Sequence, residues 1–362
     1  MAQKTPLFQA HVDAGARMVE FAGWTLPIRY GSLVDEHHAV RRAAGMFDVS
    51  HMTVVDIQGP DARVALRRLL ANDVDKIAEP GQAIYGCMLD ETGGIIDDLI
   101  TYRLEDDFYR MVVNAATREA DLAWIDEQLQ SFDVRARERD DLAMIAVQGP
   151  EANRHVAGLF EVPELAELKP FRSLVHGDFF IARTGYTGED GCEIVLPNAL
   201  ADPAWRRLVD AGVVPAGLGA RDSLRLEAGL NLYGQDMDRE TTPLESNLAW
   251  TVAFEPADRD FIGRAALEAQ KARGVSRKLV GLLFQSGGIP RSGAAVITPA
   301  GAGVVTSGGF GPTIERPIAM ARVPVEAEDQ VEVELRGRKL PARIVKLPFV
   351  RNGKPRSGLP TP

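Results

Sequence analysis

Two adjacent acids interrupt an apolar stretch of the chain. Asp97 and Asp98 lie in residues 93–100, Gly-Gly-Ile-Ile-Asp-Asp-Leu-Ile, which begin at a glycine turn and otherwise have the composition of a buried strand. Burying a carboxylate is costly unless the group is paired or hydrogen-bonded. Because successive strand residues point to opposite faces, the two acids cannot share one pocket. We expect one at a polar interface or cap; the other either faces a ligand or belongs to a turn or salt bridge.

Another acid follows a glycine-rich loop, residues 185–191, Gly-Tyr-Thr-Gly-Glu-Asp-Gly. Strand alternation predicts that Cys192, Ile194 and Leu196 point inward and that Glu193 lies on the opposite face. The glycines would let a planar ligand approach the backbone closely. A plain hairpin with an exposed Glu193 explains the same local pattern, and the local sequence alone favours it.

Two arginines lie four residues apart in residues 219–229, a stretch typical of a helix. This spacing puts Arg221 and Arg225 on one helical face. Charged residues on such a face are usually solvated and pair with acids at the surface. The local sequence therefore predicts an exposed salt-bridge face.

Common catalytic and binding motifs are missing or incomplete. The chain has no GxxxxGK[ST] loop and no HExxH, and residues 217–222 carry Asp222 where a dinucleotide fingerprint has its third glycine. His37 and His38 are adjacent and point in different directions on any regular element, which disfavours a shared metal. Ser50 and His51 are adjacent as well, so we expect a structural role for His51 instead of a nucleophilic triad.

The elements that must position these residues contain an internal repeat. The sequence Gln-Gly-Pro-acid-Ala follows an apolar run at residues 58–62 and again at 148–152. Glycine frees the turn, and proline suits the start of a helix because its missing N–H is not needed there. Each copy then continues with two strands and a helix, at 95–104, 108–114 and 117–129 and at 178–183, 192–196 and 201–209. The order β-α-β-β-α thus occurs twice, which predicts two ferredoxin-like α+β units packed side by side, although chance reuse of one turn sequence is an alternative.

The pattern changes near residue 278 to short strands separated by Gly and Pro. Their regular spacing favours a small antiparallel barrel or sandwich. The expected strands are 278–284, 294–297, 303–306, 318–323, 331–335 and 340–345. A length of 362 residues, at roughly 100 to 200 residues per domain, agrees with two or three domains.

Charge is unevenly distributed along the chain. The 41 basic and 51 acidic residues give a net charge of -10, which speaks against generic binding of duplex nucleic acid or of anionic membranes. Residues 331–362 nevertheless carry a net charge of +6 (eight basic minus two acidic), which leaves -16 for residues 1–330. The two cysteines, Cys87 and Cys192, are too few for a disulfide framework or a structural zinc site. The N-terminus lacks a signal-peptide pattern, and no apolar run approaches bilayer length, so we expect a soluble cytoplasmic protein.

Five blocks of the sequence resemble the T-protein family, the aminomethyltransferases of the glycine cleavage system. The resemblance runs along the whole chain. It rests on residues 20–24, 45–52, 93–100, 183–191 and 219–229, in the order that the family has them.

The resemblance implies a tetrahydrofolate-dependent enzyme that needs no metal and no nucleotide, with tetrahydrofolate as co-substrate. Such an enzyme takes the aminomethyl group from the lipoyl arm of the H-protein, releases ammonia, and leaves 5,10-methylenetetrahydrofolate and the dihydrolipoyl arm. Its partners would be the lipoylated H-protein, with the P- and L-proteins acting in the same pathway. No nucleic acid and no membrane is implied.

The resemblance also implies roles for individual residues. Asp98 matches the key carboxylate of the family, so Asp97 becomes its structural neighbour. Glu193 falls at the position that accepts the N–H donors of the pterin ring, and Arg221 at that of an arginine that orients this carboxylate or contacts folate. Further candidates for the folate pocket are Tyr186, Met52, Tyr85 and Asn114, and Arg351 is a candidate for binding the glutamate tail.

The fold that the resemblance implies has three domains arranged like a clover leaf around a central channel. We expect a folate-binding α+β domain from residues 1–51 and 141–250, a second α+β domain from 52–140, a connecting segment at 251–277 and a C-terminal antiparallel β-barrel at 278–362. Related folate domains of sarcosine dehydrogenases are usually fused to flavin domains, for which this chain has neither room nor fingerprint. An iron–sulfur-related folate-binding protein of the same scaffold carries a Lys-Gly-Cys-Tyr motif that is absent here. A noncatalytic folate-binding protein and a demethylating folate enzyme remain the alternative functions.

Overall fold

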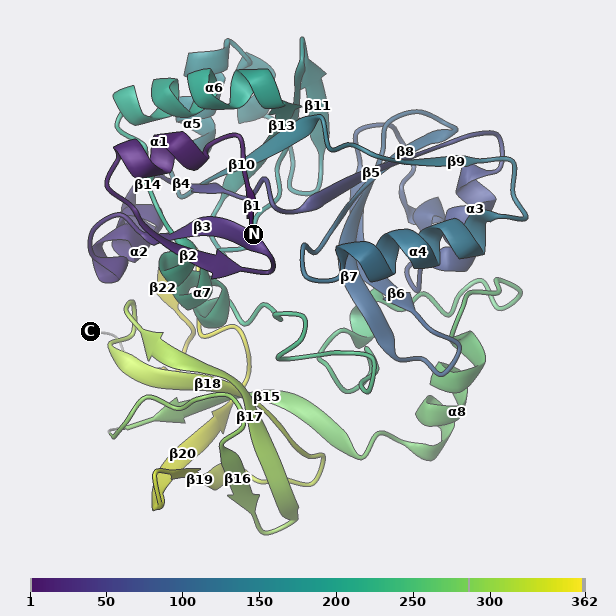
Figure 1. The fold of residues 1–362 in the computed structure, drawn as a ribbon. Helices are drawn as coiled ribbons and strands as arrows, with labels where there is room; N and C mark the ends of the chain where they lie inside the picture. The colour runs from purple at the N-terminus through teal and green to yellow at the C-terminus, as the bar shows by residue number, and fades with distance from the viewer. Residues whose placement is uncertain (1, 286, 360–362) are drawn as a thin grey trace.

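A computed structural model describes residues 2–285 and 287–359 of the chain. Two mixed α/β units and a β-barrel surround a common centre (Figure 1). This arrangement confirms the predicted α+β class and the clover leaf of three bodies. The residue limits that we predicted for the domains remain predictions.

The first unit is built on a six-stranded sheet with the order β11-β12-β13-β10-β4-β14. Its strands are β4 (Gly45–Asp48), β10 (Leu142–Gln148), β11 (Ser173–His176), β12 (Phe179–Ala182), β13 (Gly191–Pro197) and β14 (Val214–Pro215). Helices α5 (Ala152–Phe160) and α6 (Asn198–Asp210) cover one face, where Cys192, Ile194 and Leu196 pack against Trp205. The predicted inward direction of these three β13 side chains is confirmed.

The second unit repeats the same order in a five-stranded sheet, β6-β7-β8-β5-β9. Its strands are β5 (Thr53–Gln58), β6 (Ala83–Leu89), β7 (Ile95–Arg103), β8 (Phe108–Val113) and β9 (Arg135–Glu138), and its helices are α3 (Ala62–Leu69) and α4 (Arg118–Leu129). The neighbours β7-β8-β5 correspond to β12-β13-β10 in the first unit. The internal repeat is therefore real, and chance reuse of a turn is excluded.

The inner faces of the two sheets pack against each other. Tyr102 and Val112 of the second sheet belong to one buried cluster with Phe47, Phe180 and Val195 of the first. Helices cover the outer face of each sheet, because that face carries apolar side chains that must be buried.

The N-terminus forms a small sheet that the sequence analysis did not predict. Its strands, β1 (Gln3–Lys4), β2 (Arg17–Phe21) and β3 (Trp24–Arg29), surround α1 (Phe8–Asp13) and lead to α2 (Leu33–Arg42). β1 has only two residues, β2 lacks strict alternation of apolar and polar residues, and Pro27 interrupts the pattern of β3.

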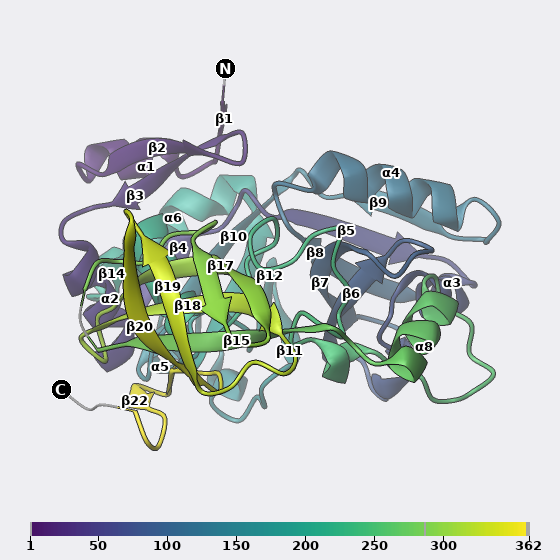
Figure 2. The ribbon, with the colours of Figure 1, turned by 90° about the horizontal axis from the view of Figure 1, so that it is seen from below.

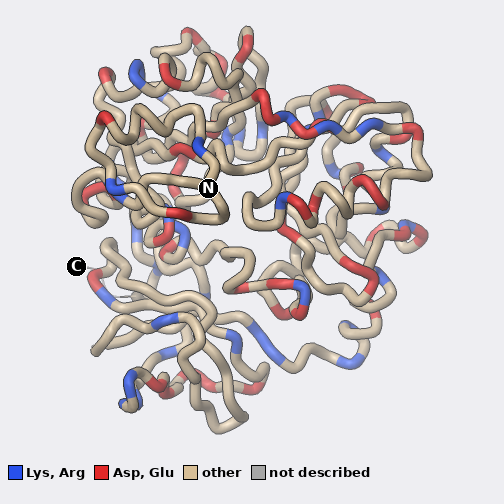
Figure 3. The backbone as a smooth tube through the Cα atoms, in the orientation of Figure 1, with Lys and Arg blue, Asp and Glu red and all other residues tan. Residues whose placement is uncertain are grey.

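Six strands of the C-terminal part close into a barrel in the order β15-β18-β17-β16-β19-β20 (Figure 2). They are β15 (Arg277–Phe284), β16 (Ala295–Thr298), β17 (Gly301–Gly311), β18 (Arg316–Pro324), β19 (Gln330–Leu335) and β20 (Arg338–Val345), and a short hairpin of β21 (Val350–Arg351) and β22 (Lys354–Pro355) follows. The barrel prediction is confirmed over its sandwich alternative. The basic residues of the 331–362 segment lie on β20 and on this hairpin and the turns beside them (Figure 3).

Helix α7 (Leu218–Glu227) joins the first unit to the barrel. Arg225 is 2 % exposed; it pairs with Asp236 at 2.8 Å and donates to the Ser307 hydroxyl of β17 at 3.0 Å. The predicted solvated face of Arg221 and Arg225 is therefore wrong. The i, i+4 spacing could not show that the barrel covers Arg225. Helix α8 (Arg264–Arg273) belongs to the connecting segment, and no described helix is long and apolar enough to span a membrane.

Candidate active site

A cavity of about 280 Å³ lies where the two sheets meet. Its walls come from β7, the loop before β13, helix α7 and the segment 229–250. Seven of the eight predicted site residues line it, namely Met52, Tyr85, Asp98, Asn114, Tyr186, Glu193 and Arg221. Arg351 does not; it is exposed on the β21–β22 hairpin, whose Asn352 N–H donates to Gly188 O at 3.0 Å. That hairpin therefore lies against the glycine-rich loop that forms part of the wall.

Strand β7 directs Asp98 into the cavity and Asp97 away from it. Asp98 Oδ2 accepts from the Tyr85 hydroxyl at 2.7 Å, and Oδ1 accepts from Asn114 Nδ2 at 3.0 Å. Asp97 is fully buried and accepts from both the backbone N–H (2.9 Å) and the side-chain Nδ2 (2.8 Å) of Asn114. The predicted separation of the two acids onto opposite faces is confirmed. Asn114 spans the strand edge and holds both carboxyls.

The Asp98 carboxyl has a pKa close to neutral pH. Burial raises its pKa to about 7, and the nearby Asp97 adds to this effect, whereas the hydrogen bonds from Tyr85 and Asn114 act in the opposite direction. The pKa of Asp97 is also raised well above its ordinary value, first by burial and then by the charge of Asp121 on α4. Asp98 can therefore exist in both protonation states near neutrality, which suits an acid–base role.

Glu193 faces the cavity from the first sheet. It is 7 % exposed, and Oε2 accepts from the Thr184 hydroxyl at 2.6 Å. Because Thr184 gives its only hydroxyl proton to Glu193, the Tyr102 hydroxyl at 3.0 Å donates to Thr184. Burial raises the pKa of Glu193, while Thr184 and the charge of Arg221 lower it. The alternative of an exposed hairpin glutamate is wrong.

Arg221 lies over the ring of Tyr186, 4.8 Å from guanidinium carbon to ring centroid. Its Nη1 is buried, with no hydrogen-bond partner among the described residues. Buried N–H groups of this kind are usually satisfied, so Nη1 is a free donor inside a site suited to a ligand oxygen. The Tyr186 hydroxyl donates to Asn231 O, which connects the glycine-rich loop to segment 229–250.

Other cavity residues were not singled out from the sequence. Trp250 stacks on Tyr85 with ring centroids 6.0 Å apart and is 67 % exposed. His51, for which we expected a structural role, also lines the cavity; burial and then the charge of Arg221 lower its pKa to about 4, so its ring is neutral. Segment 229–250 has no chemical motif, and only its aromatic residues could have drawn attention to it.

Comparisons with known proteins agree with this architecture. A family model described as "GCVT N-terminal domain" matches residues 7–256, and "Glycine cleavage T-protein C-terminal barrel domain" matches residues 277–351. The chain belongs to the T-protein family. Two relatives named "Aminomethyltransferase" are similar along their whole length. That of Stenotrophomonas maltophilia (strain K279a) is 56 % identical over 99 % of both chains, and that of Pseudomonas syringae pv. tomato is 54 % identical over 98 % of this chain and 99 % of its own.

A solved structure supports the same T-protein assignment. The crystal structure of glycine cleavage system aminomethyltransferase T from Bartonella henselae superposes with a TM-score of 0.92. It is 38 % identical and the match covers 97 % of this chain and 99 % of that one. In the described part of this T-protein, no group of three His, Cys, Asp or Glu residues is placed to hold a metal ion.

The raised pKa of Asp98 predicts a pH-dependent stability difference for Asp98→Asn. Below about pH 4 the carboxyl is neutral in both folded and unfolded chains. As pH rises toward 7, the unfolded chain ionises while the folded chain resists ionisation, so wild type loses stability that the amide variant keeps. Urea unfolding should show Asp98→Asn gaining on wild type by at most about 4 kcal/mol between pH 4 and pH 8. A difference that stays constant across this range would contradict the assigned pKa.

Proposed function

We propose that this T-protein transfers the one-carbon unit of an S-aminomethyl-dihydrolipoyl group on the H-protein to tetrahydrofolate. The products are 5,10-methylenetetrahydrofolate, ammonia and the dihydrolipoyl H-protein. The observation that carries the proposal is the pair of cavity carboxyls, with Asp98 titrating near pH 7 and Glu193 on the facing sheet. The aminomethyltransferase relatives of equal length support the same activity.

The proton balance of this reaction suits Asp98. The methylene carbon loses its bonds to nitrogen and sulfur and gains bonds to N5 and N10 of folate. The two N–H protons of folate end on the released ammonia and on the dihydrolipoyl thiol. A carboxyl that titrates near neutrality can accept and return such protons, and its charged form stabilises the electrophilic carbon that develops when ammonia leaves. Tyr85 and Asn114 hold both carboxylate oxygens in a fixed orientation.

The remaining cavity residues suit the folate itself. In this proposal Glu193 accepts the adjacent N–H groups of the pterin ring, as a carboxylate can do in pairs. Arg221 offers its free Nη1 to a ligand oxygen, and Tyr186 and Met52 form apolar walls. Arg351, on the exposed hairpin beside the glycine-rich loop, would meet the carboxylates of a glutamate tail that extends from the cavity.

The partner in this proposal is the lipoylated H-protein, with the P- and L-proteins acting in the same pathway. The positively charged 331–362 segment offers a surface for an acidic carrier or for the folate tail. Such an attraction weakens as salt is added.

Transfer should depend strongly on Asp98. We expect Asp98→Asn to lower the rate of methylenetetrahydrofolate formation from aminomethylated H-protein by about 100-fold or more, because the amide cannot carry the proton or the charge. The matched control is Glu127→Gln, on the exposed side of α4, which should transfer like wild type. Full turnover by Asp98→Asn would refute the catalytic assignment. If wild type binds folate but does not transfer the one-carbon unit, the protein is the noncatalytic folate-binding alternative. If it turns over free N-methylglycines with a flavoprotein partner, it is the demethylating enzyme.

Folate binding should depend on Glu193. Glu193→Gln keeps the size of the side chain but removes the charge and turns one acceptor into a donor that faces the pterin N–H groups. We expect calorimetry to show tetrahydrofolate binding weakened by about tenfold or more, as for the loss of a charge-assisted hydrogen bond. Unchanged affinity in a folded variant would exclude this role for Glu193.

A further inference from the structure

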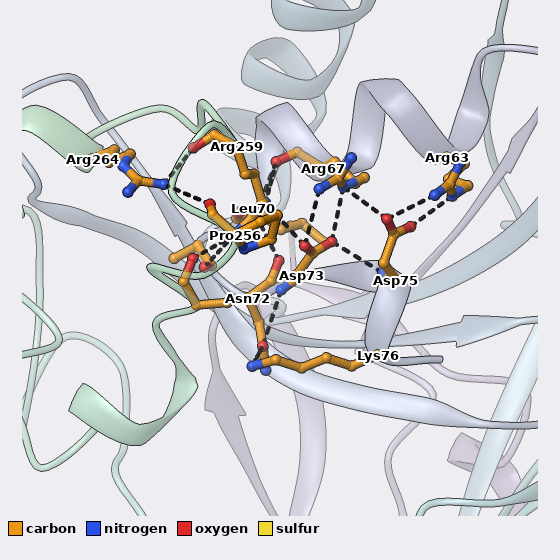
Figure 4. Close-up of polar contacts among 12 residues, drawn as sticks. Arg63, Arg67, Leu70, Asn72, Asp73, Asp75, Lys76, Pro256, Arg259 and Arg264 are labelled. Carbon is orange, nitrogen blue, oxygen red and sulfur yellow. Dashed lines mark hydrogen bonds and ion pairs between the residues drawn. The ribbon is translucent and has the colours of Figure 1, made fainter. Parts of the chain in front are cut away.

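Arg259 is a buried arginine outside the cavity, in the connecting segment before α8. It is 4 % exposed, and its guanidinium donates to carbonyl oxygens gathered from two parts of the chain (Figure 4). These acceptors are the carbonyls of Arg67 (2.8 Å), Leu70, Ala71 (3.2 Å), Asn72 (2.9 Å) and Ala253 (2.9 Å). The Asp73 carboxylate lies 3.7 Å away.

The position of Arg259 explains why a guanidinium is buried there. Four of its acceptors lie in the last turn of α3 or directly after it, where a helix leaves carbonyls without partners and favours positive charge. Burial lowers the pKa of Arg259 to about 10, so the group remains charged at neutral pH. Without Arg259, several buried carbonyls would lose their donor, and segment 253–262 would lose its main polar connection to α3.

One arm of this network reaches the Asp98 carboxyl. Arg259 donates to Asn72 O, and Asn72 Nδ2 in turn donates to Tyr85 O at 2.8 Å. Lys76 Nζ donates to Asn72 Oδ1 at 2.9 Å and so fixes the orientation of the amide. The Tyr85 hydroxyl then donates to Asp98 Oδ2. Three successive hydrogen bonds therefore connect Arg259 with the cavity carboxyl.

A second arm holds the other side of Tyr85. Arg259 donates to Ala253 O, and Ala253 N–H donates to Ala71 O at 3.0 Å, which ties residues 248–253, a segment with a short 3-10 helix (Ala249–Thr251), to the end of α3. Three residues earlier, Trp250 stacks on the Tyr85 ring. Arg259 thus holds both the backbone of Tyr85 and the residue packed on its ring.

We propose that Arg259 is a positioning residue for the transfer reaction, which holds Tyr85 between Asn72 and Trp250 so that its hydroxyl stays on Asp98. The inference rests on the proposed function only because the transfer reaction is one of the measurements that test it. Arg259 itself touches neither Asp98 nor the cavity wall, so its effect must pass through Tyr85.

Loss of Arg259 should change the pKa of Asp98 in a definite direction. The groups that act on Asp98 are Asp97 on its own strand, Tyr85 and Cys87 on β6, Asn114 after β8, Asp121 on α4 and Tyr186 in the glycine-rich loop. Tyr85 and Asn114 are the donors in this set, and a donor to a carboxylate favours its charged form. A displaced Tyr85 hydroxyl therefore raises the pKa of Asp98 and moves the acidic limb of the transfer rate to higher pH.

The test is a double-mutant cycle between Arg259→Met and Tyr85→Phe, read as the pH profile of kcat/KM for transfer. Each single variant should lower kcat/KM by about tenfold and move the acidic limb upward by about half to one pH unit, as expected for one lost hydrogen bond. The double variant should add little to either change, because both substitutions remove the same contact. Arg259→Lys should recover part of the loss, since an ammonium can still donate to some of the carbonyls.

The matched control is Arg63→Met, which removes an exposed arginine of the same region that pairs with Asp75 (Figure 4). Arg63→Met should have the same pH profile of kcat/KM as wild type.

The proposal would be overturned if folded Arg259→Met kept the acidic limb of the wild-type pH profile. It would also be overturned if the effects of Arg259→Met and Tyr85→Phe added in the double variant. If Arg259→Met does not fold, Asn72→Ala cuts the same connection and must move the limb in the same direction. If wild type does not transfer, the proposed function fails separately, and the carboxyl titration of Asp98 by ¹³C NMR in these variants still decides the role of Arg259.

Discussion

The structure around the cavity depends on one constraint, namely that a carboxyl is buried there without a cation to neutralise it. Asp98 forms no ion pair among the described residues, and its only side-chain donors are the Tyr85 hydroxyl and the Asn114 amide. A protonated carboxyl in such surroundings keeps its proton until near neutral pH, because burial disfavours the charged form. The burial that costs the fold stability is also what raises the pKa of this carboxyl toward neutrality. Each residue that fixes a donor onto Asp98 therefore influences the pKa of this carboxyl.

Helix α7 also carries buried charges, but those of Arg225 and Glu227 are paired. Arg225 meets Asp236 and Ser307, and Glu227 accepts from the backbone and hydroxyl of Thr313 and from Arg41. Breaking such a buried pair leaves an uncompensated charge and is strongly destabilising. The barrel is thereby fixed to the helix that carries Arg221 into the cavity. Arg221 of the same helix lines the cavity, and its buried Nη1 has no hydrogen-bond partner among the described residues.

Much of this arrangement could be predicted from local patterns. The repeated Gln-Gly-Pro turn reflects a shared steric need, since Gly59 and Gly149 have φ of +148° and +127° and a Cβ on either would lie 2.3 or 2.4 Å from a carbonyl oxygen. Strand alternation separated Asp97 from Asp98 and placed Glu193 opposite the core. Local sequence could not decide whether these acids were buried, and the resemblance to the T-protein family was needed to choose among the alternatives.

The residues that escaped prediction depend on contacts between distant segments. Arg225 looked like a surface arginine because the barrel strand that covers it lies about 80 residues away. Trp250 contacts β6 and Arg259 contacts the end of α3, both far earlier in the chain, so no periodicity marks these two residues. Arg351 is the predicted site residue that does not line the cavity, because it lies on a separate, exposed hairpin.

The central claim is that Asp98 titrates near neutral pH, and its carboxyl can be observed directly. Protein carrying aspartate labelled with ¹³C at the side-chain carboxyl would be titrated by NMR, and the resonance absent from Asp98→Asn would identify Asp98. The account predicts a midpoint near pH 7 for this resonance. A midpoint near pH 4, the value of an ordinary aspartate, would contradict it.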